Sequence, residues 1–586
     1  MSSESFSRPA ARNQTEVFAV HGADPEVLAF AMAKYSRSAL SMRESLAEIS
    51  AQRAEQFLNT FYFQYGHRSI ADLAHIALAV ERLSLMAAIV LVDEQRWDGQ
   101  ERSTRYQNFL KSGWYLPDFG EDSEPAALYS QTVESLFAVY QRTSAAVLEV
   151  LRSRITRPET LKPESYERTL KARAFDVARY LLPLATNTSL GQIVSARTLE
   201  AQVSRLLSHP AAEVRDLGAK LREAATGPAW KVNARAAQGL VEKLAAFERQ
   251  GSGVRGQGSG IRDQGSGARG QGSEETALKG HDRGSRESGP QAGETSQTEG
   301  ALAAERSLAA EAAELLTREV RSAPTLVKYA QPNPYEMETR ATLTQAAAEM
   351  LQGLPMAEAP LVDLVERTET LEVELAATLL YSASHYPYRQ IRDLVAGLPG
   401  SRVLEIIQLG TRHRGKHDET LRAFHAGAAL RFDILMDIGG FRDMHRHRRS
   451  TQIIQGFTAE HGYETPGSAD LPAGVDILAE AGVEGDYRSA IESAHRAGAQ
   501  IAASQAPEAA QSALYLLPLA TRIRALFKMD FAEAQYICEL RSAAAGHFSY
   551  RRVAWEMYRA IERQHPALAK HIRVTDFTKA IDMLQR

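Results

Sequence analysis

Two short polar runs, far apart in the chain, carry side chains that bind phosphate and carboxylate oxygens. Residues 445–449 read HRHRR, and residues 101–106 read ERSTRY. Guanidinium groups hold such oxygens in a bidentate way, so the first run suits a dinucleotide pyrophosphate or an electron-rich ring edge. In the second run Ser103 adds a hydroxyl donor to Arg105, which suits a phosphate monoester.

Simpler interpretations of the basic run remain open. A cluster such as Arg446, His447 and Arg448 is often a solvated surface turn. A metal site at His445 and His447 is the weaker alternative, because the neighbouring arginines would repel a cation.

A seven-residue identity indicates that the two halves of the chain are copies. YLLPLAT occurs at Tyr180–Thr186 and again at Tyr515–Thr521. Other landmarks recur around it in the same order, for example His67 in the first half and His417 in the second. A repeat at several hundred residues predicts a domain duplication rather than a solenoid.

Composition agrees with two folded domains. The chain has 586 residues, 44% of them hydrophobic, and a net charge of −4 that gives no general attraction to nucleic acid or anionic membranes. The longest apolar run, Leu85–Val92, is too short to span a bilayer, and no signal peptide is recognisable. The single cysteine, Cys538, excludes an intrachain disulfide. We expect a cytoplasmic protein.

The expected domain boundaries follow the shifts in composition. We predict a disordered N-terminus at 1–14, a first domain at 15–245, a disordered linker at 246–305, a connecting segment at 306–339 and a second domain at 340–586. The linker repeats a Gly- and Ser-rich heptad with too little apolar surface to fold. It has no interleaved aromatic residues for base stacking, so we expect no nucleic-acid partner.

Hydrophobic periodicity predicts an α+β fold for each copy. Apolar residues alternate with polar ones over Leu430–Ile434, which predicts a half-buried strand directly before Arg446, and Ile76–Val80 alternates at the matching place. Helical spacing runs through Val133–Leu151 and, more briefly, through Tyr487–Ala494. One sheet packed with several helices is the natural architecture.

With the copies aligned, the two polar runs resemble parts of one motif of the flavin-dependent thymidylate synthases. That family carries Arg-His-Arg, then seven residues, then Ser, in a run ending Glu-x-Ser-x-Arg-Tyr. Counting back from Ser103 reaches residues 93–95, which read DEQ, and counting forward from Arg448 reaches Gly456. Each copy keeps the part that the other has lost.

The resemblance implies two sets of binding residues. The flavin would be contacted by Arg446, His447, Arg448, His67 and Ser69. The substrate nucleotide, dUMP, would be bound by Glu101, Ser103, Thr104, Arg105 and Arg179. Without the motif, His67 would more often be structural and Arg179 would be a residue of a helix surface.

Arg541 carries the implied catalytic role. Its distance from the second YLLPLAT matches the family without a gap, and the resemblance implies that it stabilises negative charge developing on the uracil ring. The alternative is an arginine that neutralises a helix C-terminus. In the first copy the equivalent position falls near Leu206 or Leu207.

Each copy also departs from the family pattern. The second copy has Gly456 and Thr458 in place of the Ser and Arg, and Asp530 and Tyr536 where flavin-contacting asparagines are expected, while the first has Ser195 at the first of those two places. The two copies together hold a nearly complete set, which predicts one composite site across a pseudo-twofold interface. Because family members are homotetramers, we expect a homodimer of tandem chains.

The implied activity is an FAD-dependent thymidylate synthase. It would methylate dUMP to dTMP, with methylenetetrahydrofolate as carbon donor and NADPH as reductant. Two alternatives stay open: a flavin- and folate-dependent methyltransferase acting on another nucleotide or on RNA, and a noncatalytic nucleotide- or flavin-binding regulatory protein.

Overall fold

The computed structural model describes residues 23–34, 70–231, 234–243, 246, 310–314, 316–415, 418, 420–466, 476–570 and 572–585. The chain divides into two compact units, one of residues 1–226 with 323–586 and the other of residues 227–322. In the smaller unit, Pro228 forms an antiparallel bridge with Arg321. The predicted N-terminal segment at 1–14 and almost all of the predicted linker lie outside the described residues.

Within the larger unit, the first copy has the elements α1 (Pro25–Lys34), β1 (His75–Ser84), α4 (Leu85–Leu91), β2 (Asp98–Glu101), α5 (Ser123–Arg154), α6 (Pro163–Ala178), the short 3-10 helix η3 (Arg179–Leu181), β3 (Asn187–Ser195), α7 (Ala196–Leu207) and α8 (Ala212–Thr226).

The second copy has a longer set of elements. They are α11 (Pro334–Leu351), β4 (Val362–Leu364), α12 (Leu371–Ser382), α13 (Tyr388–Ala396), α14 (Gly400–Leu409), η4 (Arg422–Phe424), β5 (Leu430–Asp437), α15 (Ile438–Met444), β6 (Thr451–Ile454), α16 (Ile477–Glu480), α17 (Glu484–Ala502), α18 (Ala509–Leu514), β7 (Arg522–Met529), α19 (Phe531–Ser542), α20 (Phe548–Gln564) and α21 (Pro566–Ala569).

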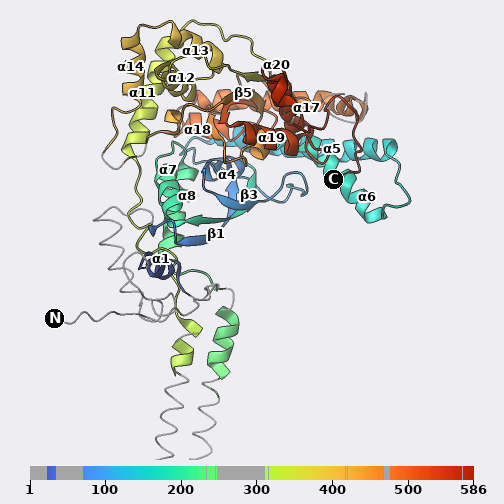
Figure 1. Cartoon of the computed structure of the whole chain (residues 1–586). Coiled ribbons are helices and arrows are strands. Elements are labelled where there is room, and N and C mark those ends of the chain that lie inside the picture. The colour runs from blue at the N-terminus through green and yellow to red at the C-terminus, as the bar shows by residue number, and fades with distance from the viewer. Residues whose placement is uncertain are drawn as a thin grey trace, which may run out of the picture. The chain divides into compact units, whose positions relative to one another are not determined.

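The two sheets repeat one antiparallel pattern. Their strand orders are β1-β3-β2 and β4-β5-β7-β6. The strand after each YLLPLAT is the central one, with β1 and β2 beside β3 and their counterparts β5 and β6 beside β7. In the second copy β4 adds an edge strand. Helices α11 to α14 gather together in Figure 1 and form a hydrophobic cluster of their own against the second sheet. The α+β prediction with two tandem domains is confirmed.

The predicted elements lie where the periodicity placed them, with two corrections. Strands β1 and β5 and helices α5 and α17 contain the predicted segments. However, β5 is buried on both faces, and its buried charges are paired: Arg431 with Glu369 and Asp433 with Arg524. Arg446 also does not directly follow the strand, since the helix α15 intervenes.

The two YLLPLAT segments pair with one another across an approximate twofold axis. Leu184 N–H donates to the Leu517 carbonyl and Leu519 N–H to the Leu182 carbonyl, both at 2.9 Å. The equivalent prolines of the two segments form an antiparallel bridge. Such reciprocal contacts are the mark of an isologous interface. In this protein the interface lies within one chain.

A continuous hydrophobic core runs through that interface. The rings of Tyr115 and Tyr515, one from each copy, lie 4.9 Å apart between centroids, and buried residues of both copies belong to one cluster. Helix α5 lies beside its counterpart α17 in Figure 1. The two copies therefore form a single compact unit. None of the helices in the described part of the chain is long and apolar enough to cross a bilayer.

Candidate functional site

Guanidinium groups from both copies act on the carboxylate of Asp443, which lies in α15. Its carboxylate accepts a hydrogen bond from Arg179 Nη1 at 3.3 Å. Burial would raise the pKa of Asp443, but the positive charges of Arg179 and of Arg105, Arg446 and Arg541 lower it. Four of the predicted site residues, two from each copy, thus come together near one carboxylate.

Arg179, which directly precedes the first YLLPLAT, is almost completely buried. Its exposed fraction is 1%, so its interpretation as a helix-surface residue is wrong. Nη1 is directed to Asp443. Nε and Nη2 have no hydrogen-bond partner in the described part of the chain, and they lie 3.5 and 3.4 Å from the point where a Cβ on Gly439 would be.

Arg105 is held rigidly between the copies. Its Nε and Nη2 donate to the two carboxylate oxygens of Asp176 at 2.7 and 3.3 Å. Its Nη1 donates to the Tyr550 hydroxyl at 2.9 Å, and Nη2 also donates to the Ala545 carbonyl at 3.2 Å. With four of its five hydrogens used by the protein, Arg105 is positioned firmly but has little left to offer a ligand.

Arg541 and His447 are in direct contact. Arg541 Nε donates to His447 Nε2 at 2.7 Å, which places the imidazole proton on Nδ1, 3.6 Å from Glu533. Burial lowers the pKa of His447 and the charge of Arg541 adds to this, while Glu533 opposes both. Tyr550 lies beneath the Arg541 guanidinium, 5.4 Å from ring centre to Cζ. The neutral imidazole therefore fixes Arg541 near the C-terminus of α19.

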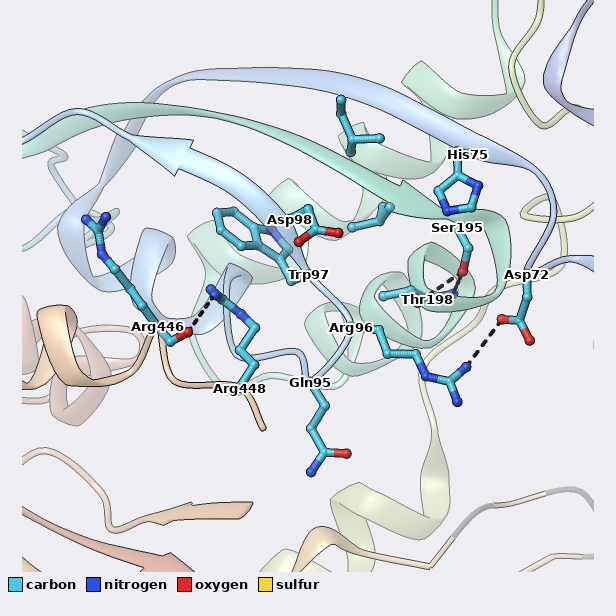
Figure 2. Close-up of a pocket in the computed structure, with 12 residues that line it drawn as sticks. Asp72, His75, Gln95, Arg96, Trp97, Asp98, Ser195, Thr198, Arg446 and Arg448 are labelled. Carbon is cyan, nitrogen blue, oxygen red and sulfur yellow. Dashed lines mark hydrogen bonds and ion pairs between the residues drawn. The ribbon is translucent and has the colours of Figure 1, made fainter. Parts of the chain in front are cut away.

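A cavity of about 520 Å³ opens next to this cluster. Figure 2 shows Arg446 and Arg448 of the second copy at one end of it, facing Trp97 of the first copy, with Ser195 towards the other end. The Arg448 guanidinium lies 4.4 Å from the Trp97 ring centre. Arg446 is exposed whereas His447 is buried, so the basic run is only in part a solvated turn.

The remaining predicted residues occupy different places. Glu101 is ion-paired with Arg442 of the second copy. The Ser103 hydroxyl accepts from Arg105 N–H at 3.2 Å within its own turn, and Thr104 is buried. His67 and Ser69 lie outside the described residues, although Asp72, a few residues later, lines the cavity.

At the twofold-related positions in the other copy, apolar side chains replace two of the arginines and Asp443. Because β3 with α7 and β7 with α19 match residue for residue, Leu206 stands opposite Arg541 and is buried. In the same way Leu514 and Val90 replace Arg179 and Asp443 and pack against the hydrophobic core. Within the described part of the chain, the positions related by the axis to Arg541, Arg179 and Asp443 are therefore apolar.

Comparison with protein families decides the identity of both copies. The family model described as thymidylate synthase complementing protein matches residues 18–227 and 363–567, well over half of the chain. The chain belongs to the thymidylate synthase complementing protein family. Both matches lie inside the predicted domains, whose boundaries stay a prediction.

Relatives from two organisms align with this chain over nearly their whole length. A UPF0159 protein of Chlamydia pneumoniae is 24% identical over 96% of this chain and 92% of its own length. Another from Thermoplasma acidophilum is 23% identical over 93% of this chain and 94% of its own. A solved structure of flavin-dependent thymidylate synthase ThyX from Helicobacter pylori, with FAD and dUMP, matches 34% of this chain and 89% of that chain at 16% identity, with a TM-score of 0.23.

Three residues of the cluster were not predicted from the sequence. Asp443 stands close to the basic run, where an acidic residue is a local signal that could have been noticed. Asp176 lies just before Arg179, and its partner Arg105 is 71 residues away in sequence. Tyr550 is 445 residues from Arg105, and nothing in the sequence links the two.

Proposed function

We propose that this protein is an FAD-dependent thymidylate synthase that methylates dUMP to dTMP in one composite site. The observation that carries the proposal is the contact between site residues of the two copies: Arg179 of the first copy is ion-paired with Asp443 of the second, and Arg105 of the first copy and Arg541 of the second both contact Tyr550. Among the described residues, the twofold-related positions carry Leu206, Leu514 and Val90 instead. Membership of the family supports the same reaction.

The cavity beside Arg446 and Arg448 fits the proposed flavin. Its volume of about 520 Å³ lies in the range of cofactor pockets. The two guanidinium groups suit a pyrophosphate or a flavin edge, and Arg448 Nε is a buried donor without a partner in the described residues. We assign Arg446, His447 and Arg448 to this site, with His67 and Ser69. Bound FAD would supply hydride to the one-carbon unit.

On the substrate side, the residues of the first copy bind and orient the nucleotide. We assign Glu101, Ser103, Thr104, Arg105 and Arg179 to dUMP. Arg179 would bind its phosphate, and Arg105, which is held by Asp176 and Tyr550, would contribute its one remaining N–H. Arg541 is fixed through its Nε by His447, so its remaining donors act on charge that develops on the pyrimidine. A positioned guanidinium makes a cysteine nucleophile unnecessary, and Cys538 is buried.

We also propose two co-substrates and an oligomeric state. Methylenetetrahydrofolate would provide the one-carbon unit and NADPH the reducing equivalents, in the cytoplasm. A homodimer of tandem chains would give the four domains of a family tetramer.

The visible absorption spectrum of the purified protein, recorded before and after addition of dUMP, tests the proposal. A flavin band that shifts with dUMP places cofactor and nucleotide in one site. Rescue of a thymidine-requiring strain tests turnover. Failure of rescue by soluble, flavin-loaded protein would refute thymidylate synthesis, and failure to take up FAD would favour the noncatalytic alternative.

A further inference from the structure

We propose that Asp443 is a built-in competitor of the substrate phosphate. In the ligand-free protein its carboxylate is bound at Nη1 of Arg179, and a phosphate monoester binds by displacing it. This inference rests on the proposed function, because it concerns how the same site selects its nucleotide.

The geometry of Arg179 leaves the two anions one donor to share. Nη1 is directed at Asp443, at 3.3 Å. Nε and Nη2 are buried beside Gly439, at 3.5 and 3.4 Å from the position that a Cβ on this residue would take, so a phosphate does not reach that edge. A ligand oxygen that reaches Arg179 must therefore take the position of the Asp443 carboxylate.

The exposed fractions of the Asp443 and Arg179 side chains also support displacement of the carboxylate. The Asp443 side chain is 17% exposed and that of Arg179 only 2%, so the carboxylate lies on the side from which a ligand approaches. The other arginines of the cluster also act on Asp443. An anion that replaces the carboxylate would meet the same field, whereas for an anion that binds beside it the carboxylate would offset part of the attraction.

The fold does not need an ion pair at this position. The twofold-related pair, Val90 and Leu514, is uncharged and packs against the hydrophobic core. A purely architectural role for Asp443 and Arg179 would be met equally well by such an apolar pair. A neutral side chain at position 443 is thus compatible with the fold.

The test compares Asp443→Asn and Asp443→Ser with the wild-type holoprotein, using dUMP and deoxyuridine as paired ligands in calorimetric titrations. Both variants remove the competing charge, so we expect about tenfold tighter binding of dUMP and no change for deoxyuridine, which has no phosphate. Inorganic phosphate should compete with dUMP more effectively in both variants. Asp486→Asn, at an exposed ion pair on α17, is the matched control and should change neither ligand.

The outcomes separate this inference from the proposed function. Weaker dUMP binding by the variants, or an equal change for both ligands, overturns the competitor role while thymidylate synthesis stands. If the wild-type holoprotein binds no dUMP at all, both proposals fall. Thermal unfolding of the two neutral variants checks that they are folded.

Discussion

Arg541 shows how a single side chain gains a function from its partners. On its own it is an arginine in the last turn of α19, where it would also favour the helix dipole. The bond from its Nε to His447 and the Tyr550 ring beneath it fix the guanidinium in the composite site. The two interpretations of this residue are therefore compatible.

Replacing Arg541 tests whether charge or position matters more. We expect Arg541→Ala to lower the turnover of dUMP by about 10²–10³-fold, because a preorganised donor to developing charge is lost. Arg541→Lys keeps the charge but loses the Nε contact with His447, and should recover only part of the rate. Steady-state kinetics with flavin content measured in parallel checks this.

Arg573→Ala, whose guanidinium is largely exposed, is the control and should behave as wild type. Full activity of Arg541→Ala would contradict the role of charge stabilisation.

The buried imidazole of His461 should make the stability of the protein depend on pH. Burial lowers its pKa to about 4, with help from the charges of Arg524 and His385. The unfolded chain, with a histidine pKa near 6.5, binds more protons than the folded one between these values, so stability is present above pH 6.5 and is lost as the pH falls towards 4. His461→Gln should remove this part of the dependence.

Urea unfolding at pH 7.5 and pH 5.0 checks it. We expect the variant to lose about 2 kcal/mol less than wild type between the two values. His565→Gln, at an exposed position, should leave the wild-type dependence unchanged. An identical pH dependence in wild type and His461→Gln would refute the assignment.

At the scale of elements, the same strand-to-helix junctions occur in both copies with different residues. Ser84 and Asp437 cap α4 and α15, and Ser195 and Asp530 cap α7 and α19. Both Ser and Asp side chains accept a hydrogen bond from a free backbone N–H of the first helical turn. The architecture therefore persists while the site residues diverge. Asp530 and Ser195, found where the family pattern has an asparagine, thus both have a structural task.

The paired YLLPLAT segments should contribute symmetrically to stability. Leu184 and Leu519 are equivalent and completely buried. We expect Leu184→Ala and Leu519→Ala each to cost about 2–5 kcal/mol, by similar amounts, because each leaves a cavity in the same shared core. Chemical unfolding measures both free energies.

Leu404→Ala, at a largely exposed position in α14, is the control for this pair and should cost little. A large loss in one variant and none in the other would show that the two copies are not packed as the twofold axis requires.

For the whole molecule, the composite site makes a prediction about complementation. The contacts of Arg179 with Asp443 and of Arg541 with His447 all form within one chain. Co-expression of an Arg179→Ala chain with an Arg541→Ala chain should therefore fail to rescue a thymidine-requiring strain, because every site lacks one arginine. Growth of the co-expressing strain would mean that the two arginines of one site come from different chains.

The control for that experiment is a single wild-type chain expressed with either variant. It should rescue growth, because its own site is complete. This control distinguishes the loss of a complete site from a dominant inhibition of the assembly by the variant chain.

The sequence by itself determined the duplication, the α+β class and the identity of the separated motif halves. YLLPLAT, the alternation in β1 and β5 and the spacing to Arg541 are local patterns, and local patterns are visible in one dimension. Domain boundaries and the roles of individual site residues stay predictions.

Only the tertiary structure decided how the halves meet. The pairing of Leu184 with Leu517, the burial of Arg179 and the position of Asp443 among four arginines depend on contacts between residues hundreds of positions apart. Sequence spacing cannot encode which surfaces pack. A carboxylate among guanidinium groups reads as one more charged residue until burial and distance show what it faces.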